Sequence, residues 1–139
     1  MRRQLHILLL LVMISPLMAQ VAVVNASVPN DAIDIKRMAA MLLGRVTIWS
    51  DGSPVVLVLA ADPLADVYLV QVTGRERQVL ERGWKRLVFA GAGAMPLTAR
   101  SAEDALLLVA ATPGAVVLLD QAPTDPRWRV IALVATANR

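Results

Sequence analysis

The sequence predicts one α/β domain with a mostly parallel sheet flanked by helices, and three observations lead to this fold class. The chain has 139 residues, which is about the length of a single domain. Its valine- and leucine-rich segments are short and nearly all apolar, as strands are when both faces of a sheet are covered. Helical segments alternate with these strands, and such alternation is typical of parallel sheets with helices on both faces.

Residues 1–19 have the three-part layout of a secretory signal peptide. Arg2 and Arg3 form a basic start, residues 5–14 form an apolar stretch interrupted by His6, and the small residue Ala19 ends a cleavage site. We therefore expect export to the periplasm and a mature domain that spans residues 20–139. The alternative is an uncleaved N-terminal anchor, in which case the chain would contact the membrane through this segment alone.

Four strands and four helices are predicted along the mature chain. The strands are at residues 21–24, 54–59, 115–119 and 128–134, and the helices are at residues 34–44, 62–74, 75–88 and 101–112. Asp34 begins the first helix as its cap, apolar residues then recur at i, i+3, i+4 and i+7, and Gly44 ends it. The second strand begins at Pro54, a position where a missing N–H is tolerated.

The later helices have their own start signals. Asp62 caps the second helix and Pro63 occupies its first position, although the valines of this segment also suit a strand. The third helix shows apolar residues at helical spacing against a charged face. Ser101 and Asp104 resemble a capping box at the start of the fourth helix.

The residue types that most enzymes and metal sites need are nearly absent. The chain has no cysteine and one histidine, His6, which leaves with the signal segment. Zinc bound by histidine or cysteine, Ser–His–Asp and Cys–His nucleophiles and a histidine general base are therefore excluded. The carboxylates stand mostly at helix starts and on mixed-charge faces. We expect a protein that is not an enzyme and that carries no metal or cofactor.

Charge argues against a nucleic-acid partner. The formal net charge is +3, and it falls to +1 once Arg2 and Arg3 leave with the signal segment. The mature chain has no basic run, and its charges alternate in sign. We therefore expect no binding to nucleic acid.

Three segments resemble stretches of the phosphate-binding proteins that serve ABC transporters. Residues 42–52 resemble the family pattern FLGKITxWxDG, and residues 84–91 are similar to the pattern WxxxxFxG of its short members. Residues 109–116 resemble the pattern VAATPGAIGY, which precedes a late strand. The three matches occur in order and span most of the mature chain.

The resemblance implies a single lobe of a type II periplasmic binding fold, which binds a small oxyanion such as phosphate and delivers it to a membrane permease. Two departures concern the ligand. Where the family has a Ser-Gly-Thr loop, this chain reads Ala-Ala-Asp-Pro at residues 60–63, and Val117 and Leu118 replace the family's Gly-Tyr. One lobe also lacks the second wall of a cleft, unless a homodimer supplies it.

The candidate oxyanion donors are Asn25, Ser27 and Thr47. Asn25 and Ser27 follow the first strand, and open α/β sheets bind ligands at the carboxyl ends of their strands. The alternative is that both are turn residues that bond to their own backbone. Trp49 and Trp84 are either ligand-stacking residues or part of the core.

The helix starts argue against a bound anion. Free N–H groups at a helix N-terminus attract phosphate, but carboxylates already stand at three of the predicted starts: Asp34, Asp62, Asp66, Glu103 and Asp104. No arginine is placed by the sequence to reverse that sign. Two like charges about 4 Å apart repel by about 1 kcal/mol in water and by more in a dry cleft.

Two functions stay open at this point. The first is weak binding of a small oxyanion by the lobe or by a dimer of it. The alternative is a ligand-free interaction module, derived from the same fold, that docks on a protein of the cell envelope through an apolar face.

Overall fold

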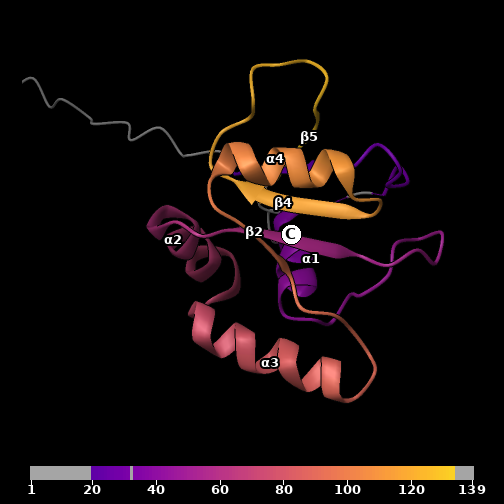
Figure 1. Ribbon diagram of the computed structural model, residues 1–139, viewed down its shortest axis with the longest axis vertical. Helices are drawn as coiled ribbons and strands as arrows, with labels where there is room; N and C mark the ends of the chain where they lie inside the picture. The colour runs from indigo at the N-terminus through magenta and orange to yellow at the C-terminus, as the bar shows by residue number, and fades with distance from the viewer. Residues whose placement is uncertain (1–19, 32, 134–139) are drawn as a thin grey trace, which may run out of the picture.

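The computed structural model describes residues 20–31 and 33–133, a sheet with helices on both of its faces (Figure 1). The proposed signal peptide at residues 1–19 lies outside the described residues, as does the end of the last predicted strand. The strands are β1 (Val21–Val24), β2 (Val56–Ala60), β3 (Leu97–Ala99), β4 (Ala115–Leu119) and β5 (Arg129–Ala132). The helices are α1 (Ile35–Leu42), α2 (Pro63–Thr73), α3 (Arg77–Phe89) and α4 (Ala102–Ala111).

The sheet is mixed. Its strand order is β3-β2-β4-β1-β5, with β2 parallel to β3 and β4, and β1 antiparallel to β4 and β5. The predicted α/β class is confirmed, and the sheet departs from the expected parallel arrangement in one strand: β1 runs against both of its neighbours, while the other four strands run in one direction. An apolar run indicates that both faces of a strand are covered, and it carries no information on the direction of that strand.

Side chains of the strands alternate between two cores. Ala22 and Val24 of β1 belong to the core formed with α1, α2 and α3, whereas Val21 and Val23 belong to the core formed with α4. In Figure 1, α4 lies in front of the sheet and α1 lies behind it. Coverage of both faces is therefore confirmed, and it explains why β1 is apolar at every position.

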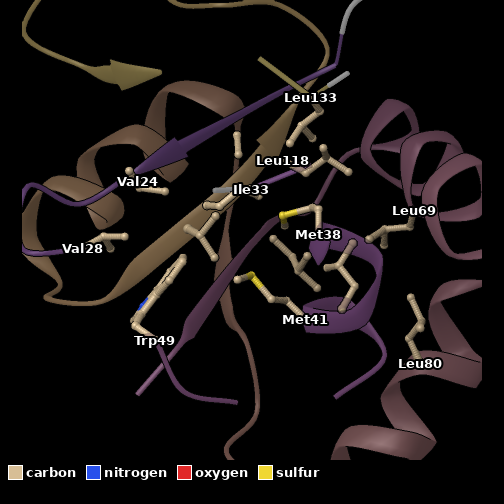
Figure 2. Close-up of a cluster of buried hydrophobic side chains, with 14 of the residues drawn as sticks. Val24, Val28, Ile33, Met38, Met41, Trp49, Leu69, Leu80, Leu118 and Leu133 are labelled. Carbon is tan, nitrogen blue, oxygen red and sulfur yellow. The ribbon is translucent and has the colours of Figure 1, made fainter. Parts of the chain in front are cut away.

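The core between the sheet and helices α1 to α3 is the larger of the two (Figure 2). Met38 and Met41 of α1 lie at its centre, between Leu118 of the sheet and Leu69 of α2. Both methionines are almost completely buried. Flexible thioether side chains suit this place because three helices and a sheet leave an irregular space between them.

Two buried tryptophans join this core to the backbone. The indole of Trp49 donates to the Gly114 carbonyl at 3.0 Å, and the indole of Trp84 donates to the Leu42 carbonyl at 2.7 Å. Both residues belong to the core cluster. Their interpretation as core residues is therefore confirmed.

The predicted helix ends are present. Asp34 accepts a hydrogen bond from the Arg37 N–H at 2.7 Å, and Asp62 accepts one from the Ala65 N–H at 2.9 Å. Gly74 ends α2 with a φ of +69°, a left-handed conformation that glycine adopts without strain. The valines of α2 are thus in a helix rather than in a strand.

Two features of the second half were not predicted. β3 has three residues and pairs with residues 58–60 of β2, and such a short strand shows no recognisable alternation. α3 continues to Phe89, one residue beyond the predicted end. Among the described helices, none is both long and apolar enough to cross a bilayer.

Candidate functional site

Asn25 and Ser27 follow the carboxyl end of β1, as expected, but this end of the sheet is the one at which the parallel strands β2 and β4 begin. Asn25 follows β1, and because β1 is antiparallel to β4, it lies beside the start of β4, where its N–H donates to the Ala115 carbonyl at 2.9 Å. At the start of β2, the Val55 N–H donates to the Thr47 carbonyl at 2.9 Å. The N-termini of α2 and α4 follow the other ends of the parallel strands. The donors and these helix starts therefore do not form one site.

The side chain of Asn25 is fully used by the chain itself. Its amide nitrogen donates to the carbonyls of Val109 at 2.7 Å and Ala110 at 3.1 Å, and its amide oxygen accepts from the Ser27 N–H at 2.8 Å. Asn25 is 8% exposed. The turn interpretation is confirmed by the bond to Ser27, while the bonds to the end of α4 were not predicted. No donor of Asn25 remains for an anion.

Ser27 takes part in a brace around Gly114. Its hydroxyl oxygen accepts from the Gly114 N–H at 2.9 Å, and the Gly114 carbonyl accepts from the indole of Trp49 at 3.0 Å. Gly114 has a φ of +76°, and a Cβ at this position would collide with the carbonyl of Pro54. Through these bonds, Ser27 after β1 and Trp49 before β2 both hold the residue that precedes β4. The role of Ser27 in the brace is therefore structural.

Thr47 lines an apolar groove between β2 and α3, which we name the β2–α3 groove. The groove has a volume of about 290 Å³, and its lining includes Met41, Thr47, Leu57, Trp84, Leu87 and Met95. No side-chain hydrogen bond joins Thr47 to another described residue. Thr47 therefore lines a different surface feature from Asn25 and Ser27, which do not line this groove, although all three lie toward the same end of the sheet.

The β2–α3 groove suits apolar side chains. Its lining contains one hydroxyl, that of Thr47, and the indole of Trp84 is already bonded to a carbonyl. β3 pairs with residues 58–60 only, so the first half of β2 has no strand beside it on the groove side. A dianion in this groove would lose its hydration without gaining enough donors.

The starts of α2 and α4 are occupied by polar groups of the chain. Asp62 caps α2, and Ser101 caps α4 by accepting from the Asp104 N–H at 3.1 Å. Asp104 accepts in turn from the Arg100 N–H at 3.0 Å, and this backbone hydrogen bond is the main cause of its lowered pKa. The interpretation of Asp34 and Asp62 as ordinary caps is confirmed. An ionised carboxylate at a helix start repels a second anion.

Arg77 lies beside the start of α2, where no arginine was predicted. Its Nε donates to Asp66 at 2.5 Å, and its Nη2 donates to the Ala60 carbonyl at 2.9 Å. The charge of Asp66 is thus balanced within the chain. This contact was missed because it forms when α3 folds back beside α2, and no local pattern indicates that return.

A polar surface hollow, which we name the arginine hollow, was also missed. It is lined by Asn30, Asp31, Ile33, Asp34, Arg37, Arg129 and Ile131, which come from distant parts of the chain. Asp31 accepts from the Arg37 Nη2 at 3.2 Å and from the Ser50 N–H at 3.0 Å. A side-chain hydrogen bond from Ser50 is the main cause of the lowered pKa of Asp31.

The two guanidinium groups of the arginine hollow differ in their bonding. Arg129 donates to the Val28 carbonyl, and at 3.0 Å to both the Pro29 carbonyl and the Asn30 side chain. The Nε of Arg37 is buried and has no hydrogen-bond partner among the described residues. The two arginines are balanced by two aspartates, so the hollow carries little net charge.

The described residues contain no group of three acids, histidines or cysteines that could hold a metal ion. The family resemblance remains a prediction. The chain matches no protein-family model and no curated protein.

Proposed function

We propose that the chain is a non-catalytic interaction module of the cell envelope, which holds an extended apolar segment of a partner protein in the β2–α3 groove. The observation that carries this proposal is that the side chains lining the groove are apolar, apart from the hydroxyl of Thr47 and the indole N–H of Trp84. The hydrogen-bonding groups of Asn25 support it, because they are used by the chain's own backbone and leave no donor for an anion.

The size and position of the groove favour an extended segment. Its volume of about 290 Å³ is at the lower limit of ligand pockets and suits one or two large side chains. Its lining combines the start of β2, which pairs with β4 but not with β3, and residues 92–95 of the segment before β3. A segment in an extended conformation can insert alternate side chains into such a groove.

The test is a titration with a capped peptide of alternating leucine and serine, followed by the methyl NMR signals of the methionines. Met41 and Met95 line the groove, so we expect their methyl signals to shift. Met38 does not line it, so its methyl signal should stay in place. Ala94→Phe places an aromatic ring in the groove and should abolish the shifts. Ala111→Phe, at an exposed position on α4, should leave them unchanged. Shifts that survive Ala94→Phe would overturn the proposal.

Thr47 distinguishes the two functions that the sequence left open. Thr47→Val removes the groove's single hydroxyl and should raise the affinity for the leucine peptide about threefold, because no polar group is then desolvated. If Thr47 instead donates to an oxyanion, the same variant should weaken phosphate binding and leave the peptide affinity unchanged.

Weak binding of a small oxyanion such as phosphate is the second candidate function. It is favoured by the Nε of Arg37, which is buried at the arginine hollow without a partner in the described part of the chain. Asp31 and Asp34 in the same hollow limit the affinity, so we expect a dissociation constant in the millimolar range. Calorimetric titration with phosphate and sulfate tests this candidate. Arg37→Gln should abolish the heat and the exposed Arg75→Gln should keep it.

The setting is part of the same proposal. We infer export to the periplasm and a single lobe of a type II periplasmic binding fold, supported by the N-terminal pattern and the three resembling segments. An envelope protein or a permease is then the partner class, and a homodimer would supply the missing wall. N-terminal sequencing of the exported protein tests the first step, with Gln20 expected as the first residue.

A further inference from the structure

One face of α3 carries a stripe of positive charge that ends in a phenylalanine. Arg82, Lys85, Arg86 and Phe89 stand at i, i+3, i+4 and i+7, the spacing that places side chains on one face of a helix. All four are exposed, and they line one shallow hollow of the surface. We name this set the α3 stripe. It is separate from the face through which Leu80 and Trp84 enter the core.

The cations of the α3 stripe have no acidic partner. The ion pairs of the described residues join other groups, and none of them includes Arg82, Lys85 or Arg86. The sequence has no aspartate or glutamate from residue 82 to residue 102. Glu81 is the acid nearest in sequence, and it is half-buried. The surface around the stripe therefore keeps a net positive charge.

Phe89 projects from the end of this stripe. It is the chain's only phenylalanine and is 91% exposed. The residues at 90–94 that follow it are small and exposed, and Val88 and Met95 add further exposed apolar surface. In Figure 1, α3 lies along the lower margin of the molecule, and the loop after it forms an outer corner. The exposed ring of Phe89 thus has the cations of α3 on one side and the uncharged residues 90–94 on the other.

We propose that the α3 stripe docks the domain onto an anionic membrane surface. Phe89 enters the interface among the lipid headgroups, while Arg82, Lys85 and Arg86 bind lipid phosphates. Aromatic residues favour the bilayer interface, and lysine and arginine near it are attracted to anionic lipids. A bilayer accepts a projecting side chain without a preformed pocket, which a protein partner would have to supply. This inference does not depend on the β2–α3 groove.

The first test places a fluorescent label beside Phe89. The chain has no cysteine, so Ala90→Cys gives the full chain a single attachment site for bimane. Vesicles of phosphatidylcholine and phosphatidylglycerol in roughly equal amounts, with brominated acyl chains, quench a label that reaches the bilayer. We expect quenching at Ala90→Cys and none at Ala102→Cys, an exposed alanine at the start of α4. Equal quenching at both positions, or none at either, would overturn the proposal.

The second test removes the charges while keeping that label. Lys85→Gln with Arg86→Gln should raise the lipid concentration for half-maximal quenching by roughly 25-fold, about fivefold for each cation. Lys36→Gln with Arg100→Gln makes the same change in net charge elsewhere and should have little effect. In the protein with the unaltered stripe, salt at about 1 M should weaken the quenching of the label, because charges are then screened within a few ångströms.

The third test addresses Phe89 and the competing partner class. Phe89→Ser should weaken the quenching about tenfold, whereas Leu107→Ser, at an exposed position of α4, should not. Both side chains are exposed, so neither variant should lose its fold. If soluble polyglutamate binds through Lys85 and Arg86 while the label remains unquenched by vesicles, the stripe serves an acidic protein and the membrane proposal is wrong.

Discussion

The side-chain amide of Asn25 donates to the Val109 carbonyl at 2.7 Å and so joins residues that are 84 positions apart. Val109 and its neighbour Ala110 belong to the last turn of α4, where most backbone carbonyls have no partner within the helix; the Val109 carbonyl accepts only a long bond, 3.4 Å, from the Thr112 N–H. One side chain thus satisfies the end of α4 and fixes that helix to the exit of β1.

Replacing Asn25 by alanine should destabilise the fold. Asn25→Ala leaves the Ala110 carbonyl without its donor and the Val109 carbonyl with only the 3.4 Å bond from the Thr112 N–H, and a loss of about 1–3 kcal/mol in the free energy of unfolding is expected. Urea denaturation followed by circular dichroism measures it. Asn30→Ala, at an exposed position, should cost less than about 0.5 kcal/mol. Equal effects of the two variants would contradict the capping role.

Gly114 should tolerate alanine much less well than Gly52. Both residues have a positive φ, so Gly→Ala costs about 1 kcal/mol of backbone strain at either position. A Cβ at Gly114 would also collide with the Pro54 carbonyl, whereas a Cβ at Gly52 meets nothing. We expect Gly114→Ala to cost at least about 2 kcal/mol more than Gly52→Ala, since the backbone must shift. Thermal and urea unfolding of both variants check this difference.

The indole N–H of Trp84 should contribute measurably to stability. Trp84→Phe leaves the buried Leu42 carbonyl without its donor and opens a small cavity, which together should cost about 2–3 kcal/mol. Trp128 is only half-buried, so Trp128→Phe should cost less than about 1 kcal/mol. Urea unfolding of both variants is the measurement, and a smaller effect at Trp84 would argue against this role for its indole.

Asp31 should make stability depend on acidity. Its pKa is lowered, chiefly by the hydrogen bond from the Ser50 side chain, so its contribution is present above the unfolded-state pKa and is lost as pH falls through the folded-state pKa. Ser50→Ala should therefore reduce stability at neutral pH, with the difference shrinking below about pH 4. Urea unfolding between neutral and strongly acidic pH tests this. Thr124→Ala, in an exposed loop, should leave the profile unchanged.

Local signals allowed the helices to be predicted. Asp34 and Asp62 cap helices because a short carboxylate side chain can reach the N–H three residues later, and this geometry depends on neighbouring residues only. Gly74 ends α2 for an equally local reason. Such signals depend only on residues that are close in sequence, so one sequence is enough to predict the helix ends.

Long-range contacts could not be predicted in the same way. The direction of β1 depends on its neighbours β4 and β5, and its own valines suit either direction. The roles of Asn25 and Ser27 depend on α4 and Gly114, which lie far along the chain. The capping roles of Asp34 and Asp62 were predicted correctly, whereas the long-range bonds of Asn25 and Ser27 could not be foreseen from their neighbours.

The placement of β1 has a consequence for the order in which the protein can fold. Its two neighbours in the sheet, β4 and β5, are the last of the described strands along the chain. Until they emerge, the first strand has both edges unpaired, and apolar unpaired edges are prone to aggregate. Closing such a large loop of chain also slows folding. The central strand of the antiparallel half of the sheet therefore cannot pair until β4 and β5 have left the ribosome, so the sheet forms late in synthesis.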